Sequence, residues 1–118
     1  MADNRRLERV AGNLKKEISL ILDRKVSDPD KGLVTISAVK VSPDLKIAKV
    51  YYTVFGDDAQ KAKTKKALRR SSGFIRNELK PSIKSRWLPE LHFYYDESIE
   101  YAQHINALIA KIHDDSDD

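Results

Sequence analysis

Apolar residues recur at intervals of three and four in the N-terminal part of the chain, as they do on one buried face of an α-helix. These residues are Leu7, Val10, Ala11, Leu14, Ile18, Ile21 and Leu22. Asn4 precedes them and can cap the helix N-terminus. Residues 26–32 (VSDPDKG) then combine Ser, Asp, Pro and Gly, which end helices or favour turns. The pattern predicts a long amphipathic helix followed by a loop.

The pattern then changes to the alternation that is typical of β-strands. Residues 33–41 (LVTISAVKV) are rich in β-branched side chains, and residues 45–55 (LKIAKVYYTVF) alternate between apolar and polar. The sequence SPDL between them supplies turn chemistry, so we expect two antiparallel strands. The apolar phase of the first strand slips after Ile36, which predicts a β-bulge near Ala38.

Helical spacing returns after Asp57, which precedes Gln60 by three residues as in a capping box. The apolar stripe is weak before Gly73 and sharper after it. Glycine inside a helix costs about 1 kcal/mol relative to alanine. Gly73 is therefore expected either to kink the helix or to cap it before a second helix begins, and both alternatives give two helices at an angle. Pro81 predicts a further kink or an early end.

The C-terminal part of the pattern predicts one more strand and one more helix. Residues 91–95 (LHFYY) alternate, and DESIEY opens a helix with acids in its first turn, where the helix dipole favours them. The predicted fold is α+β, in the order helix, strand, strand, basic helix, helix, strand, helix. A chain of 118 residues has the size of one domain, for which we expect residues 1–113, followed by a disordered acidic tail at 114–118.

Charge is segregated along the chain, although the net charge is only +4. Residues 60–89 contain ten basic residues and one acid, whereas eight acids and one lysine follow from residue 90 onward. A concentrated positive field is what a protein needs to approach a polyanion, although a run of charges can also be only a solvated helix face. The sequence favours nucleic acid as the partner.

The residue types that support catalysis do not come together. His92, His104 and His113 lack metal-ligand spacing, there is no cysteine, and the four glycines are too scattered for a phosphate-binding loop. No secretory signal is present, and no apolar run approaches the roughly 20 residues of a membrane span. We expect a cytoplasmic protein that is not an enzyme, with no cofactor and no metal.

The motifs SPDL, AKVY, GFIR and PELHFYYDES, in this order and spacing, resemble the bacterial ribosome-binding factor A family over about residues 5–109. The resemblance implies a single KH-like domain that binds the 30S subunit near its neck and contacts 16S rRNA. It also implies a role in late maturation of 16S rRNA and its 5′ end, notably during growth in the cold. Ser71-Ser72-Gly73 stands where the family has an Ala-x-Gly bend in place of the GxxG clamp of other KH domains.

We expect the glycine bend, the cations around it and the basic start of the first helix to contact RNA. The predicted site residues are Lys65, Arg69, Arg70, Gly73, Arg76, Lys80, Lys84, Arg86, Arg5 and Arg9. These cations are expected to neutralise phosphates and to recognise RNA shape rather than stack bases. Asp30 stands where the family usually has arginine, which places a phosphate contact from that loop in question.

Aromatic side chains are expected mainly in the core or the sheet, as for Phe55, Phe93, Tyr94 and Tyr95. Trp87 is the one aromatic residue that we would test for RNA contact, although burial is favoured for it as well. Two other functions stay open at this point, an rRNA-processing nuclease and a regulator that places its basic helix in a DNA major groove. Nothing demands a dimer, so a monomer is expected.

Overall fold

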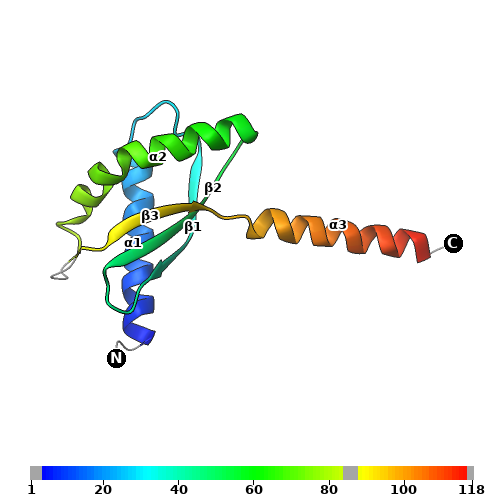
Figure 1. Cartoon of the computed structure of the whole chain (residues 1–118), viewed down its shortest axis with the longest axis horizontal. Helices are drawn as coiled ribbons and strands as arrows, with labels where there is room; N and C mark the ends of the chain where they lie inside the picture. Colours follow the sequence, from blue (N-terminus) through cyan, green and yellow to red (C-terminus); the bar gives the residue numbers. More distant parts are fainter. Residues whose placement is uncertain (1–3, 84–87, 117–118) are drawn as a thin grey trace.

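The computed structural model describes residues 4–83 and 88–116, and these form three helices and three strands (Figure 1). In chain order the elements are α1 (Asn4–Arg24), β1 (Val34–Val41), β2 (Ile47–Val54), α2 (Asp58–Leu79), β3 (Glu90–Tyr95) and α3 (Ser98–Ser116). The predicted α+β class and the three predicted strands are confirmed.

The strands form one sheet in the order β1-β2-β3. β1 and β2 are antiparallel, as predicted, whereas β3 lies parallel to β2 on its other side. The register shifts between Ile36 and Ala38, so the predicted bulge is confirmed and contains Ser37. The Ser37 hydroxyl donates to Oδ2 of Asp96 at 2.5 Å, which ties the bulge to the residue that follows β3.

The core lies between one face of the sheet and helices α1 and α2. The sheet contributes alternate residues of β2, as its pleat requires, and each helix contributes its apolar stripe. The residues that are at most 3% exposed include Leu14, Ile18, Leu22, Ala48, Val50, Tyr52, Leu68, Ile75 and Leu79. Full burial of a large aliphatic side chain contributes about 1.5–3 kcal/mol, so this cluster fixes where α2 lies on the sheet.

Helix α2 is one continuous helix of 22 residues, so the predicted division into two helices at Gly73 is wrong. The glycines with positive φ are Gly32 and Gly56, which excludes a left-handed cap at Gly73. Leu68 before the glycine and Ile75 after it are both completely buried. Packing of both turns on the same core outweighs the weak helix propensity of one glycine.

Both ends of α2 follow from residues near them. Asp57 is the N-cap, and its carboxylate accepts the backbone N–H of Gln60 at 2.9 Å. The Gln60 side chain does not complete a capping box, because its amide group donates to the carbonyl oxygen of Asp30 instead. At the other end Lys80 is the C-cap, one residue before Pro81, so the prediction of an early end is confirmed.

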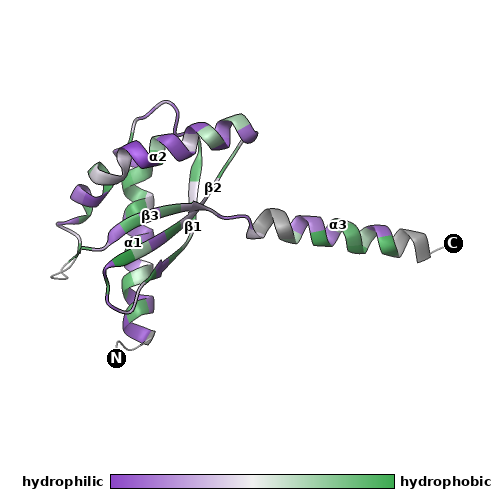
Figure 2. Cartoon of the chain, in the orientation of Figure 1, coloured by the Kyte–Doolittle hydropathy of each residue, from purple (hydrophilic) through white to green (hydrophobic). Residues whose placement is uncertain are grey.

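Helix α3 extends away from the sheet, and its apolar side is exposed (Figures 1 and 2). Leu108 is 45% exposed, Ile109 51% and Ile112 68%. The helix continues to Ser116, past the boundary expected at residue 113, and the division into a domain and a tail stays a prediction. Within the described ranges, no helix combines the length and apolar character that a membrane crossing requires.

Candidate nucleic-acid interface

Helix α2 carries a row of cationic residues on the side that faces away from the core. At 3.6 residues per turn, residues spaced by three or four fall along one line of a helix. We call this line the outer stripe, and it consists of Lys65, Arg69, Gly73, Arg76 and Lys80. All five residues are exposed. The structure therefore brings five of the predicted site residues together on one continuous surface.

The side chains of Lys65, Arg69 and Lys80 form no ion pair or hydrogen bond within the part of the chain that the structure describes. Arg76 differs, because its guanidinium donates to two backbone carbonyl oxygens. Its Nη2 lies 2.9 Å from the oxygen of Leu88, and its Nε lies 3.2 Å from the oxygen of Pro89. Arg76 thus ties α2 to the segment before β3, and three cations of the stripe stay available to a partner.

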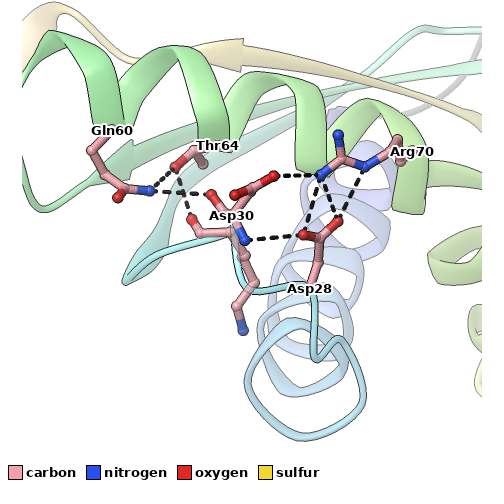
Figure 3. Close-up of polar contacts among 6 residues, drawn as sticks. Asp28, Asp30, Gln60, Thr64 and Arg70 are labelled. Atoms are coloured by element: carbon pink, nitrogen blue, oxygen red, sulfur yellow. Dashed lines mark hydrogen bonds and ion pairs between the residues drawn. The ribbon is translucent and has the colours of Figure 1, made fainter.

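Arg70 points to a different side of α2, toward the loop between α1 and β1 (Figure 3). Its Nη2 lies 2.9 Å and its Nε 3.2 Å from Oδ2 of Asp28, and Nη2 also lies 3.2 Å from Oδ2 of Asp30. The planar guanidinium suits this forked contact with a carboxylate. Arg70 therefore holds the loop on α2, and its predicted RNA contact competes with two carboxylates.

The pKa of Asp28 lies below its ordinary value, first because the backbone N–H of Asp30 donates to its carboxylate and second because Arg70 does. The hydrogen bond with Asp28 in turn raises the pKa of Arg70. Both groups therefore keep their charges at neutral pH. Asp30 is a second partner of Arg70 and brings negative charge to this loop.

Thr64 and Gln60 lie on the same side of α2 as Arg70, and we call these three residues the inner flank (Figure 3). Thr64 is completely buried. Its hydroxyl donates to the carbonyl oxygen of Lys31 at 2.8 Å and accepts from Nε2 of Gln60 at 3.1 Å. Nε2 of Gln60 also lies 3.1 Å from the carbonyl oxygen of Asp30. The inner flank thus donates hydrogen bonds to backbone carbonyl oxygens of the loop between α1 and β1. The sequence pattern alone did not reveal this role of Gln60 and Thr64.

The remaining predicted site residues are not part of the outer stripe. Arg5 and Arg9 are exposed near the start of α1, which Figure 1 places at the opposite end of the domain from α2. Lys84, Arg86 and Trp87 lie outside the described residues. No group of three or more His, Asp or Glu side chains suited to a metal ion occurs among the residues that are described. The assignment of all ten site residues to RNA binding stays a prediction.

The aromatic residues divide between the core and the surface. Phe93 and Tyr95 pack against the core, as expected. Phe55, in contrast, is 82% exposed just after β2, so the prediction that it lies in the core is wrong. Tyr94 belongs to the sheet, as expected, but is 43% exposed on it. Alternation along β2 and β3 was the sequence signal that could have placed Tyr51 and Tyr94 on the face of the sheet opposite to the core.

Comparison with known proteins places the chain in a family. Residues 6–109 match the family model described as ribosome-binding factor A. The ribosome-binding factor A of Staphylococcus saprophyticus is 46% identical over 110 residues, which is 93% of this chain and 96% of that protein. The one from Desulfatibacillum aliphaticivorans is 40% identical over 107 residues, which is 91% of this chain and 87% of that protein.

Solved structures agree with the sequence comparison. The crystal structure of ribosome-binding factor A from Thermus thermophilus matches with a TM-score of 0.66 at 25% identity, covering 75% of this chain and 94% of that one. A homology model of the same protein, fitted into a cryo-EM map of its complex with the 30S subunit, matches with a TM-score of 0.61 at 25% identity, covering 74% and 91%. The chain therefore belongs to the ribosome-binding factor A family.

Proposed function

We propose that this protein is a non-catalytic assembly factor that binds the 30S ribosomal subunit and contacts 16S rRNA. It acts as a cytoplasmic monomer and assists late maturation of 16S rRNA, including its 5′ end, with a role in growth in the cold. Family membership and the 30S complex of a Thermus thermophilus relative support the choice of subunit. The observation that carries the RNA contact is the outer stripe.

The outer stripe has the length and chemistry of a surface that follows an RNA backbone. At a rise of 1.5 Å per residue, Lys65 and Lys80 are about 22 Å apart along α2. Lysine and arginine bind phosphates by charge and release condensed counterions, so affinity falls as salt rises. Together with the adjacent exposed Lys66, the stripe presents four cations that the fold does not use. For about four phosphates, log affinity should fall against log salt with a slope near −3.

Gly73 has a role in this surface that the fold does not give it. A Cβ built at Gly73 meets no atom within 4 Å, so nothing inside the protein requires a glycine there. Its position between Arg69 and Arg76 leaves the helix backbone bare in the middle of the cations. An RNA backbone can approach more closely at this point than over any larger side chain. Gly73 was expected to bend the helix. We propose instead that it allows the RNA backbone to approach the helix closely.

Sedimentation with isolated 30S, 50S and 70S particles tests the proposal. The wild type should pellet with 30S, and the triple variant Lys65→Glu, Arg69→Glu, Lys80→Glu should not, because acids in place of these cations repel phosphates. Arg76 is left unchanged because it supports the backbone before β3. The control is Lys15→Glu with Lys16→Glu, which reverses two exposed charges on α1. Equal pelleting of the triple variant and the control would contradict the assignment of the stripe.

Two further measurements address maturation and catalysis. Cells without the protein should accumulate 16S precursor with an unprocessed 5′ end, more so in the cold, and the triple variant should not restore processing. Purified protein incubated with that precursor and Mg²⁺ should produce no cleavage with turnover. Cleavage that depends on this protein would replace the proposed assembly factor with a nuclease.

A further inference from the structure

The sheet has a second face, opposite to the one that α1 and α2 cover. Ala48, Val50 and Tyr52 of β2 belong to the core. Because successive side chains of a strand point to opposite faces, Lys49 and Tyr51 lie on the other side. The contacts of α1 and α2 with the sheet are made through the core side, and α3 extends away from the sheet (Figure 1). This second face is open to solvent.

Two tyrosine rings lie side by side on the open face. Tyr51 of β2 and Tyr94 of β3 are register partners, and their ring centroids are 5.8 Å apart with an interplanar angle of 32°. Tyr94 is 43% exposed, and Tyr51 is partly exposed. Nζ of Lys40 lies 5.6 Å from the centre of the Tyr51 ring. The two rings thus lie against each other at a tilt, and the Lys40 ammonium lies over the face of the Tyr51 ring.

A row of basic side chains crosses the sheet next to these rings. Lys40 of β1 is the register partner of Lys49 of β2, and Lys49 is the register partner of His92 of β3. Like charges opposite each other in a sheet destabilise it, so folding does not explain this row. Two acids lie near the row. Oε1 of Glu90 is 3.7 Å from Nε2 of His92. Hydrogen bonds and, to a lesser extent, the charge of Lys40 lower the pKa of Asp96. Lys40 and Lys49 are both exposed on this surface.

The surface beside Tyr51 is also hollowed. A depression of about 390 Å³ lies next to the ring, and its lining includes Lys40, Ser42, Ile47 and Lys49. This volume falls in the range of sites for small organic groups. The apolar, aromatic and cationic parts of its wall match the three parts of a nucleotide: the sugar, the base and the phosphate.

We infer that this face binds an unpaired segment of RNA, with bases stacked on Tyr51 and Tyr94 and phosphates at Lys40 and Lys49. We call these four residues the tyrosine platform. Stacking needs an exposed base face, which a duplex does not offer, so the ligand is single-stranded. The inference rests on the proposed function, since that function supplies the RNA. It places a second RNA contact on the side of the domain opposite to the core.

Binding of a labelled single-stranded oligo(A) of about ten nucleotides tests the platform, with an RNA duplex of equal length as the competitor. The double variant Tyr51→Leu, Tyr94→Leu keeps apolar side chains on the strands but removes the rings. Its dissociation constant for the single strand should rise at least about tenfold. The matched control is Tyr51→Phe with Tyr94→Phe, which keeps the rings and should bind as the wild type does. Thermal unfolding verifies that both double variants are folded.

Three outcomes would overturn the inference: no binding of the single strand by the wild type, equal binding of duplex and single strand, or unchanged binding by the folded leucine variant. A photo-crosslinker at position 94 in the 30S complex adds an independent measurement. Crosslinks to RNA support the platform, and crosslinks to ribosomal protein alone overturn it.

The same variants separate the platform from the outer stripe. The triple variant of the stripe should lose 30S pelleting and still bind oligo(A), because its substitutions lie on α2 and leave the open face of the sheet intact. If the leucine variant binds oligo(A) normally while the triple variant loses 30S, the inference fails and the proposed function stands. If the wild type binds oligo(A) through its tyrosines but never pellets with 30S, the proposed function fails and the platform stands.

Discussion

The inner flank and the outer stripe of helix α2 both carry arginine, but the arginines differ in what they contact. Arg70 on the inner flank is held by Asp28 and Asp30, whereas its sequence neighbour Arg69 on the outer stripe has no such partner among the described residues. A run of cations in a sequence is therefore not one uniform surface. The inner flank holds the loop on α2, and the outer stripe is the surface that we propose for RNA.

Substitution of Thr64 should have the largest effect on the inner flank. Thr64→Val keeps the shape of the side chain but removes the buried hydroxyl that donates to the carbonyl oxygen of Lys31. The free energy of unfolding should fall by about 1–3 kcal/mol in denaturant titrations, with 30S pelleting intact. The control Thr35→Val changes an exposed hydroxyl and should stay within about 0.5 kcal/mol of wild type. Equal stability of the two variants would show that the buried hydrogen bond does not matter.

Substitution of Gly73 should separate stability from binding on the outer stripe. Gly73→Ala should raise the free energy of unfolding by about 1 kcal/mol, because alanine is the better helix former. It should also weaken RNA binding, because the new methyl group lies where the backbone of the RNA approaches. Gly12→Ala is a matched control, since a Cβ at Gly12 in α1 also meets nothing within 4 Å. That variant should gain similar stability with unchanged RNA affinity, and equal RNA affinities for both variants would contradict the role of Gly73.

Removal of one cation from the outer stripe should change the salt dependence of binding. Lys80→Ala should make the slope of log affinity against log salt shallower by about 1, as expected for the loss of one phosphate contact. Lys15→Ala removes an exposed charge from α1 and should leave the slope unchanged. Titrations of RNA binding at several salt concentrations give both slopes. If the two variants have the same slope, the stripe is not where phosphates bind.

The ion pair of the inner flank should give a smaller effect, seen only in acid. The pKa of Asp28 lies below its ordinary value of 3.8, so the carboxylate adds stability above that pH, and this stability is lost as pH falls through the lower pKa. In Arg70→Gln the pKa should rise toward 3.8 but not reach it, because the N–H of Asp30 still donates. The loss of stability as pH falls is then smaller and is complete at a higher pH, while it still begins near the unfolded value of 3.8.

An NMR titration of the carboxyl carbons measures this shift for each aspartate. Asp44 serves as the internal control, because the Ser42 hydroxyl and the Lys46 backbone N–H lower its pKa without Arg70. A pKa of Asp28 that does not move in Arg70→Gln would show that the backbone N–H alone holds the carboxylate in its charged form.

Local periodicity was sufficient to predict much of the fold. The first helix, the two antiparallel strands and the bulge near Ala38 follow from the spacing of apolar residues, because burial on one face imposes the period of the element on its sequence. The early end of α2 follows from Pro81 for the equally local reason that proline lacks an N–H. The family follows from the order of its motifs, since those residues serve the same structure in its members.

Other features depended on which parts of the chain pack together, and no local pattern contains that information. Gly73 stays helical because the turns on both sides of it are buried in one core. Arg70 contacts Asp28 because the loop that carries Asp28 folds against α2, and Tyr51 meets Tyr94 because β3 pairs in parallel with β2. Propensity acts within a few residues, whereas the Arg70–Asp28 and Tyr51–Tyr94 contacts join residues more than 40 positions apart. Only the tertiary structure therefore separated the cation that holds the loop from those that have no partner among the described residues.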